Sequence, residues 1–448
     1  MTKEGGDSGA ALVGPMRARP GGLLKGTATA PGDKSISHRA LIFGALADGE
    51  TAIRGLLEGE DVLRTAAAMR ALGAEAERFG DVWRVRGGPW RVPDRALYFG
   101  NSGTGVRLVM GAVAGAGVGA SFDGDKSLRA RPMGRVLEPL RMMGLEADDS
   151  DGRLPATLRP KPLSAVQVKL AAPSAQVKSA ILLAALGAAG KTRVHEPVLS
   201  RDHTERMLSA FGVDLQIESD GAEGRYIDIE GGRKLTPCGE IVVPGDPSSA
   251  AFLTAAGVIT PRADITVRNV LMNPLRAGFY ETLRDMGADI SFENERREGG
   301  EPVADIRARA SVLSGVEVPA ARAPSMIDEY PILSVVAAFA NGETKMTGLE
   351  ELRVKESDRI ASVERGLAAC GVDVESGPGW LRVRGGGGPP RGGARVAANH
   401  DHRIAMSFLV MGLASREPVE IDDGAMIATS FPGFDALLRS VGADIGPI

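Results

Sequence analysis

The stretch Asp61-Val-Leu-Arg-Thr-Ala-Ala-Ala-Met-Arg-Ala-Leu-Gly73-Ala74 holds one copy of a pattern that recurs six times along the 448-residue chain. Its apolar spacing predicts a helix over Asp61–Leu72. Gly73 suits the left-handed residue that commonly ends a helix, and strand-like runs lie on either side. The corresponding glycines of the other copies are Gly144, Gly212, Gly287, Gly371 and Gly442.

Each repeat also contains a second helix that is apolar on almost every side. In a soluble protein such a helix is buried. The order within a repeat is strand, buried helix, strand, amphipathic helix and then a two-stranded hairpin. For the first repeat, the expected strands are Thr51–Arg54, Ala74–Arg78 and Val82–Arg86. The buried helices of the six repeats contain Arg39, Arg107, Ala180, Ala250, Ile332 and Ala405.

The repeats group in threes, because near-identical segments open the first and the fourth. These are Pro31-Gly-Asp33 and Pro244-Gly-Asp246. A duplicated domain explains the coincidence, although Pro-Gly-Asp is also an ordinary turn sequence. We expect an α/β protein of two lobes, one made of residues 1–31 and 246–448 and the other of residues 32–245. The active site is expected in the cleft between them.

The composition describes a soluble globular protein with 43% hydrophobic and 25% charged residues. Its formal net charge of −4 provides no general attraction to nucleic acid. Cys238 and Cys370 are too few for a disulfide scaffold, which indicates a reducing compartment and a cytoplasmic location. Residues 1–26 lack the apolar core of a secretory signal and are expected to be partly disordered. No apolar run is long enough to span a membrane, so no membrane partner is expected.

Polar clusters lie where the buried helices begin, and helix N-termini favour anions. Lys34 to Arg39, in Asp-Lys-Ser-Ile-Ser-His-Arg, offers two cations that simple capping by Asp33 or Ser35 does not explain. The glycine-rich segment Gly100–Gly105 lets backbone N–H groups approach an anion closely. Ser174-Ala-Gln176 is a weaker signal of the same kind.

Two acidic segments in the C-terminal half indicate proton transfer beside a charged substrate. They are Asp328-Glu329 and Lys355-Glu-Ser-Asp-Arg359. The alternative is a solvated helix with ion pairs along one face. His400-Asp-His-Arg403 offers at most two metal ligands and no zinc motif supports it, so we expect no metal and interpret Arg403 as an anion contact.

Taken together, these motifs resemble the 5-enolpyruvylshikimate-3-phosphate (EPSP) synthase family, in the correct order from about residue 25 to the C-terminus. The matching segments are Pro31–Arg39, Gly100–Gly105, Arg131–Gly134, Ser174–Gln176, Asp328–Pro331, Arg353–Arg359 and Asp401–Arg403. The resemblance implies the inside-out enolpyruvyl transferase fold, with six βαβαββ repeats, three in each lobe, and buried helices. It also implies transfer of the enolpyruvyl group from phosphoenolpyruvate to the 5-hydroxyl of shikimate 3-phosphate in the shikimate pathway to chorismate.

The resemblance further assigns residues to each substrate, with no cofactor and with a monomer as the family's usual state. Asp328 would accept the hydroxyl proton, and Glu356 would protonate the phosphoenolpyruvate methylene with help from Lys34. Shikimate 3-phosphate would be bound by Lys34, Ser35, Arg39, Ser174, Ala175, Gln176, Arg201, Asp328 and Lys355. Phosphoenolpyruvate would be bound by Lys34, Gly103, Arg131, Gln176, Arg359 and Arg403.

Two positions depart from many family members. Thr429 stands where they carry lysine, and Glu351 where they carry asparagine. Both departures resemble the second bacterial subgroup of the family, some members of which tolerate the inhibitor glyphosate. Tolerance is often linked to alanine at the position of Gly103, so this chain is expected to be sensitive.

Three other interpretations remain open at this point. The related transferase acting on UDP-N-acetylglucosamine expects a cysteine within Ser127–Arg135, where none occurs. A non-catalytic protein that binds phosphorylated metabolites gains nothing from Asp328 and Glu356 beside anions. A repeat scaffold is disfavoured because the polar clusters differ from one repeat to the next.

Overall fold

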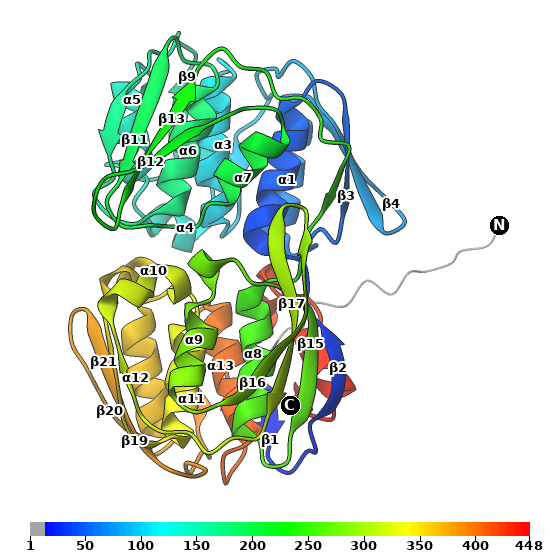
Figure 1. Cartoon of the computed structure of the whole chain (residues 1–448), viewed down its shortest axis with the longest axis vertical. Coiled ribbons are helices and arrows are strands. Elements are labelled where there is room, and N and C mark those ends of the chain that lie inside the picture. The colour runs from blue at the N-terminus through cyan, green and yellow to red at the C-terminus, as the bar shows by residue number, and fades with distance from the viewer. Residues whose placement is uncertain (1–13) are drawn as a thin grey trace, which may run out of the picture. The chain divides into compact units, whose positions relative to one another are not determined.

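The computed structural model describes residues 14–448, which form two compact units (Figure 1). The first unit contains the described residues up to Pro31 together with Gly245–Arg296 and Val303–Ile448. The second unit contains Gly32–Pro244 and the short segment Arg297–Pro302. No helix within residues 14–448 has the length and apolar character needed to cross a bilayer.

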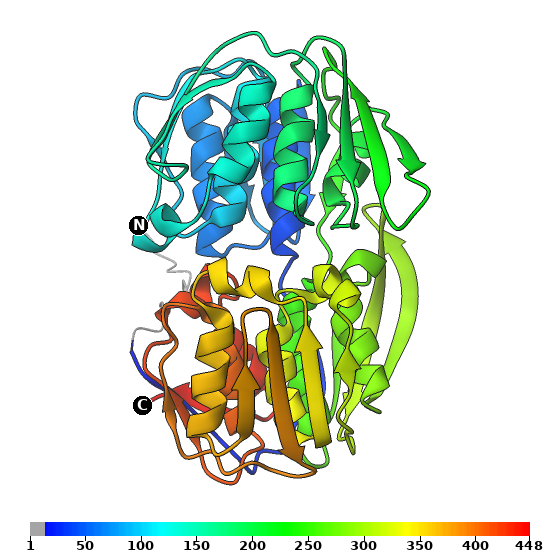
Figure 2. The same cartoon turned by 90° about the vertical axis from the view of Figure 1, so that its left-hand side faces the viewer.

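The six helices expected to be buried are present, as Figure 2 shows for each unit. Most of their side chains are inaccessible to solvent. Those of the second unit share contacts through α3, and those of the first unit contact one another pairwise. They are α1 (Lys34–Leu46), α3 (Gly103–Gly115) and α6 (Ala175–Ala185) in the second unit, and α8 (Pro247–Ile259), α11 (Tyr330–Phe339) and α13 (His402–Gly412) in the first.

Close backbone packing explains two glycines inside α3. A Cβ atom at Gly111 would lie 2.2 Å from the Ala180 carbonyl oxygen, and one at Gly115 would lie 2.4 Å from that of Leu183. Neither oxygen can move without distorting α6. The two helices therefore approach at a distance that only glycine allows.

Each repeat continues with an amphipathic helix, as predicted. The glycine that follows has a positive φ in all six copies, between 79° and 111°. The left-handed helix ends predicted from the sequence are thus confirmed. These helices are α2 (Glu60–Leu72), α5 (Gly134–Met142), α7 (His203–Ala210), α9 (Gly278–Asp285), α12 (Arg359–Ala369) and α14 (Phe434–Ser440). Two shorter helices, α4 (Lys126–Ala130) and α10 (Ala323–Met326), and the 3₁₀ turns η1 (Pro274–Arg276), η2 (Ala320–Arg322), η3 (Glu350–Val354) and η4 (Ala425–Thr429) lie between the repeats' main elements.

The strands of the second unit form three four-stranded sheets of one design. A short strand pairs in parallel with the strand that follows the buried helix, and the hairpin continues the sheet in antiparallel pairing. In strand order these sheets are β14 (Glu240–Val242), β3 (Glu50–Arg54), β5 (Val82–Arg86), β4 (Glu75–Phe79); β6 (Leu97–Tyr98), β7 (Ala120–Asp123), β9 (Ala156–Arg159), β8 (Glu146–Asp148); and β10 (Gln167–Lys169), β11 (Lys191–Glu196), β13 (Arg225–Glu230), β12 (Gln216–Ser219).

The first unit repeats this design. In strand order its sheets are β16 (Asp289–Glu298), β17 (Glu301–Arg309), β15 (Asp264–Leu271), β2 (Lys25–Thr29); β18 (Glu317–Val318), β19 (Asn341–Thr347), β21 (Trp380–Gly386), β20 (Asp373–Ser376); and β22 (Arg395–Val396), β23 (Val419–Ile421), β1 (Met16–Arg19), β24 (Asp444–Pro447). The hairpin β16–β17 carries at its tip the segment that belongs to the second unit.

The N-terminal part of the chain completes sheets of the C-terminal half. Strand β1 supplies the missing hairpin strand of the sixth repeat, between β23 and β24. Strand β2 pairs in parallel with β15. The predicted disorder before Gly26 is therefore wrong for Met16–Arg19, because strand pairing orders these residues, while residues 1–13 lie outside the described part of the chain.

Candidate active site

In the second unit, most of the predicted substrate-binding residues lie near the N-terminal ends of buried helices, whereas Arg131 and Arg201 lie in loops. Asp33 caps α1 by accepting a hydrogen bond from the Ile36 N–H at 2.7 Å. The next residue, Lys34, forms an ion pair with Asp61 (Nζ to Oδ2, 3.1 Å). Capping and the cation are thus separate features of this helix start, as the sequence indicated.

Arg39 is buried, with 2% of its surface exposed. Its guanidinium donates to the Thr204 and Ser179 hydroxyls at 2.7 and 2.8 Å and to the Ser35 carbonyl at 2.9 Å. It therefore joins the first turns of α1, α6 and α7. These bonds orient Arg39 and the first turn of α1, which carries Ser35, before any ligand binds.

His38 lies between the two cations of this helix and is fully buried. Burial, followed by the charges of Lys34 and Arg39, holds the pKa of His38 well below its usual value. Its ring Nδ1 forms a hydrogen bond with the Thr65 hydroxyl at 2.8 Å. His38 is accordingly neutral at pH 7 and adds no charge to the cluster.

The glycine-rich segment precedes α3, which Ser102 caps by accepting from the Gly105 N–H at 3.2 Å. The Arg131 guanidinium donates to the side chain and the carbonyl of Asn101, in the same segment. A Cβ atom at Gly103 would lie 2.9 Å from Arg131 Nη1. Gly103 therefore leaves the space in which this guanidinium lies.

Arg107, in the first turns of α3, is a residue that the sequence analysis did not assign to the site. Its guanidinium donates to the Gln176 side-chain oxygen and, at 3.1 Å, to the Pro132 carbonyl. The Gln176 amide in turn donates to the Thr104 hydroxyl at 2.8 Å. Arg107 thus joins the starts of α3 and α6 to the segment that carries Arg131. A charged residue near the start of an otherwise apolar helix was the available signal.

The other predicted residues of this unit lie at the start of α6 and before α7. Ser174 caps α6 (accepting from the Val177 N–H at 3.4 Å), followed by Ala175 and Gln176 in the first turn. Arg201 is half-buried in the loop between β11 and α7. Hydrogen bonds thus connect α1 with α6 through Arg39, and α3 with α6 through Gln176. Arg201 lies in a neighbouring loop.

In the first unit, the acidic residues predicted for proton transfer lie among arginines. Asp328, just before α11, places Oδ1 3.3 Å from Arg359 Nη1 and 3.9 Å from Arg403 Nε. Arg403 also donates to the Asp328 backbone carbonyl at 3.4 Å. The structure thus brings together three of the residues that the sequence analysis assigned to the site.

Arg359 is the centre of this cluster, with 1% of its surface exposed. It binds Asp401 through Nε at 2.8 Å and Glu356 through Nη2 at 2.6 Å. Burial opposes its charge, but the carboxylates of Asp401, Glu356 and Asp328 outweigh burial and raise the pKa of Arg359. Asp401, which the sequence analysis quoted only within a motif, also caps α13 by accepting from the Arg403 N–H at 3.0 Å.

Lys355 is half-buried between η3 and α12. Burial lowers the pKa of Lys355, and the negative charge of Asp328 partly opposes this effect. Its neighbour Glu351, one of the two departures, lies within η3. Thr429, the other departure, donates its hydroxyl to the Met426 carbonyl at 2.7 Å and so closes the turn η4 instead of presenting a cation.

Among residues 14–448, one group has the spacing of potential metal ligands: Asp202, His203 and Glu301 in the second unit. Arg206 lies within it, donating to Asp202 at 2.9 Å and lying 3.5 Å from Glu301 Oε2. A guanidinium already balances these carboxylates. The group therefore fits an ion-pair cluster better than a metal site.

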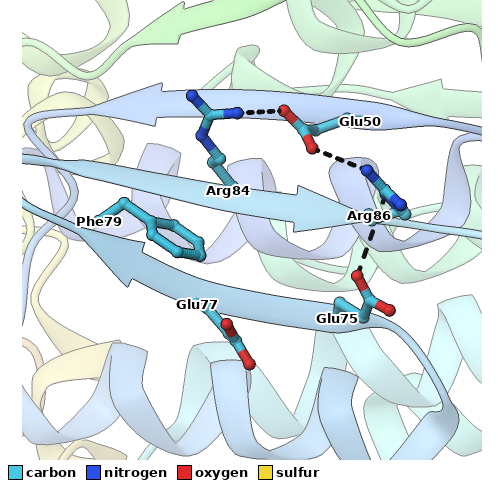
Figure 3. Close-up of a pocket in the computed structure, with 6 residues that line it drawn as sticks. All are labelled: Glu50, Glu75, Glu77, Phe79, Arg84 and Arg86. Atoms are coloured by element: carbon cyan, nitrogen blue, oxygen red, sulfur yellow. Dashed lines mark hydrogen bonds and ion pairs between the residues drawn. The ribbon is translucent and has the colours of Figure 1, made fainter.

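A separate hollow on the outer face of the β14-β3-β5-β4 sheet contains none of the predicted site residues (Figure 3). Arg84 and Arg86 pair there with Glu50 at 3.0 and 3.3 Å. All these side chains are exposed, and exposed ion pairs contribute little energy. This hollow is a solvated sheet face.

The clusters of cations at helix starts, with carboxylates in one of them, match a known family. The model for EPSP synthase (3-phosphoshikimate 1-carboxyvinyltransferase) matches residues 18–438. The chain belongs to the EPSP synthase family. The family predicted from the motifs is thereby confirmed.

Individual relatives support the same family over the full length. A protein of Phenylobacterium zucineum (strain HLK1) named 3-phosphoshikimate 1-carboxyvinyltransferase is 57% identical over 433 residues, covering 96% of this chain and 95% of that protein. One of the same name from Parvibaculum lavamentivorans is 58% identical over 438 residues, covering 96% of each chain. The 2.37 Å structure of EPSP synthase from Acinetobacter baumannii is 42% identical, with a TM-score of 0.85 and coverage of 97% of this chain and all of that one. The predicted enolpyruvyl transferase fold is confirmed by this likeness.

Proposed function

We propose that this protein transfers the enolpyruvyl group of phosphoenolpyruvate to the 5-hydroxyl of shikimate 3-phosphate and releases phosphate. One observation carries the proposal: two carboxylates, Asp328 and Glu356, lie against the same buried guanidinium of Arg359. A protein that only binds anions has no use for acids at that position. An enzyme that moves two protons beside anionic substrates requires them.

The cations account for the binding of two anionic substrates. Phosphate and carboxylate groups repel each other, and arginine pairs with both in charge-assisted hydrogen bonds. We assign phosphoenolpyruvate to Lys34, Gly103, Arg131, Gln176, Arg359 and Arg403. We assign shikimate 3-phosphate to Lys34, Ser35, Arg39, Ser174, Ala175, Gln176, Arg201, Asp328 and Lys355.

The buried helices contribute their partial positive charge to this binding. The starts of α1, α3 and α6 carry Lys34, Gly103 and Gln176. Backbone N–H groups at such a terminus donate hydrogen bonds to an anion and need no side chain to do so. The Lys34 ammonium already has Asp61 as a partner, so an incoming phosphate joins an existing ion pair.

The reaction then proceeds by addition and elimination. Asp328 removes the proton of the 5-hydroxyl group while the hydroxyl oxygen attacks C2 of phosphoenolpyruvate. At the same time Glu356 delivers a proton to C3. The resulting tetrahedral intermediate has a methyl group and retains phosphate on C2. Loss of a methyl proton and departure of phosphate restore the carbon–carbon double bond. Neither a metal ion nor a covalent enzyme intermediate takes part, and we further propose that the protein acts as a cytoplasmic monomer.

A phosphate-release assay tests the reaction itself. Phosphate is expected only when both shikimate 3-phosphate and phosphoenolpyruvate are present, in equal amount to the enol ether product. Replacing shikimate 3-phosphate by UDP-N-acetylglucosamine serves as the control for the related transferase. Phosphate release from phosphoenolpyruvate with UDP-N-acetylglucosamine, and none with shikimate 3-phosphate, would contradict the proposal.

The acid and base assignments have their own test. Asp328→Ala and Glu356→Gln are expected to retain phosphoenolpyruvate binding, seen by calorimetry, while kcat falls by about 10²- to 10⁴-fold, the usual contribution of a positioned acid or base. Glu364→Gln is the matched control. Glu364 also lies on α12, but its carboxylate accepts a hydrogen bond from the Ser376 hydroxyl at 2.6 Å instead of pairing with Arg359. Near-normal turnover in both site variants would overturn these roles.

A further inference from the structure

Helix α6 carries a charge where its pattern requires an apolar side chain. Lys178 has no exposed surface, although it lies among buried apolar residues such as Val177 and Ile181. Burying an ammonium group is costly unless it is fully paired. The proposed roles of α6, in Ser174 to Gln176, do not use this lysine.

Lys178 belongs to a closed ring of four alternating charges. Its Nζ lies 2.9 Å from Glu196 Oε1 and 2.8 Å from Glu205 Oε1. Arg225 completes the ring, with Nε 2.8 Å from Glu196 Oε2 and Nη2 2.8 Å from Glu205 Oε1. Two cations and two carboxylates balance, and they join α6, β11, α7 and β13.

The ring also forms hydrogen bonds with Ser200, in the loop between β11 and α7, through its N–H, its hydroxyl and its carbonyl. The Ser200 N–H donates to Glu196 Oε1 at 3.0 Å, and its hydroxyl donates to the same oxygen. Lys178 Nζ donates to the Ser200 carbonyl at 3.2 Å. Ser200 is 4% exposed. Its position is thus determined by charges that lie outside the loop.

Arg201 follows Ser200 directly, so the ring fixes the backbone from which the Arg201 side chain extends. We infer that Lys178, Glu196, Glu205 and Arg225 form a positioning network that orients Arg201 toward shikimate 3-phosphate, the phosphorylated cyclohexene carboxylate. The inference rests on the proposed role of Arg201 in binding shikimate 3-phosphate. A preoriented arginine loses less conformational freedom on binding, which explains why a costly buried ring is kept.

Variants that keep the charge balance test this network. Lys178→Met combined with Glu205→Gln removes one cation and one anion, leaves the Glu196–Arg225 pair, and frees the Ser200 carbonyl. Ser200→Ala is the milder variant that removes only the hydroxyl bond. Both are expected to raise the KM for shikimate 3-phosphate, by about tenfold for the double variant, while kcat and the KM for phosphoenolpyruvate change little. Asp228→Asn is the control, because it removes the ion pair between the buried carboxylate of Asp228 on β13 and Arg193, away from the loop.

A double-mutant cycle separates positioning from general destabilisation. If the network acts through Arg201, Arg201→Ala raises the same KM, and adding Lys178→Met with Glu205→Gln to it raises that KM no further. Additive effects would overturn the inference, as would an equal change of KM in Asp228→Asn. An unchanged KM in Arg201→Ala, in a protein that still requires both substrates, would overturn this inference alone. Absence of the two-substrate reaction from the unaltered protein would instead refute the proposed function.

Discussion

At the scale of single residues, Gly103 determines the space beside the Arg131 guanidinium, for which we propose a role in binding phosphoenolpyruvate. A methyl group there would lie 2.9 Å from Arg131 Nη1, closer than such contacts normally are. Arg131 can shift, because its guanidinium is the far end of a flexible side chain, but it then leaves its present hydrogen bonds to Asn101. The outcome is altered binding instead of unfolding.

We therefore expect the unaltered protein to be sensitive to glyphosate, and Gly103→Ala to raise the KM for phosphoenolpyruvate and to weaken that inhibition. Steady-state kinetics and an inhibition curve measure both. Gly88→Ala is the matched control, because a Cβ atom at Gly88 meets no other atom within 4 Å. An unaltered protein as tolerant of glyphosate as Gly103→Ala would contradict this account.

Sequence patterns identified residues at helix starts more easily than those that support them. Lys34, Gly103, Asp328 and Arg359 stand in motifs with a clear chemical reason for their type. Arg107 and Lys178 are single charges within apolar helices, and their partners lie far along the chain. Only the folded structure shows that Lys178 meets Glu196 and Glu205.

At the scale of secondary-structure elements, Asp401 joins a helix cap to a buried cation. It accepts the Arg403 N–H of α13 and both Nε and Nη2 of Arg359 on α12. Asp401→Asn leaves the buried Arg359 guanidinium with one charged partner fewer. We expect a loss of about 3–5 kcal/mol in the free energy of unfolding, measured by urea denaturation.

Asp423→Asn provides the comparison for that prediction. Asp423 accepts only the backbone N–H of Ala425, at 2.9 Å, and is partly exposed. Asparagine keeps a side-chain oxygen that accepts this bond, so Asp423→Asn is expected to change the free energy of unfolding little. Equal losses in the two variants would show that the Arg359 partnership adds no stability.

The β11–β13 pairing predicts a dependence of stability on acid. Hydrogen bonds from Arg193, aided by Lys191, lower the pKa of Asp228 to about 2, whereas the unfolded chain titrates near the usual 3.8. The folded state therefore favours the ionised carboxylate. Its stabilising contribution is complete above about pH 4 and is lost as the pH falls toward about 2.

Urea denaturation of the unaltered protein and of Asp228→Asn across pH 2–6 measures this contribution. The difference in unfolding free energy between them is expected to be constant above about pH 4 and to shrink below it. A difference that does not change with pH would show that the Asp228 charge is not the cause.

The repeat elements were predictable because each carries its own local signal. Apolar periodicity indicated the helices, and the six glycines indicated where the amphipathic helices end. The tip Arg297–Pro302 had no such signal. Its place in the second unit depends on contacts with distant residues, such as the 2.8 Å bond between His203 and Glu301.

At the scale of the whole molecule, six repeats of one design supply the proposed binding residues, and differences among the repeats supply the proposed acid and base. Each unit gathers the starts of buried helices, yet acids beside arginines occur at Asp328 and Glu356 in the first unit. Local periodicity suffices to predict the repeats. It does not predict which helix start carries an acid, since that depends on the reaction.

The proposed reaction uses proton transfer and no metal ion. Extensive dialysis against EDTA is therefore expected to leave kcat and KM unchanged, and elemental analysis should find no metal in equal amount to the protein. The Asp202, His203 and Glu301 group is the place where a tightly held ion would otherwise bind. Loss of activity that zinc or magnesium restores would contradict the account.

The most direct test of the central claim is the deuterium content of the product formed in D₂O. Addition of a solvent-derived deuteron to C3 of phosphoenolpyruvate gives a methyl group, and elimination then removes one of its three hydrogens. Deuterium is therefore expected in the methylene of the transferred vinyl group, where mass spectrometry detects it. Product formed at a normal rate without deuterium in that group would contradict addition and elimination, and with it the role assigned to Glu356.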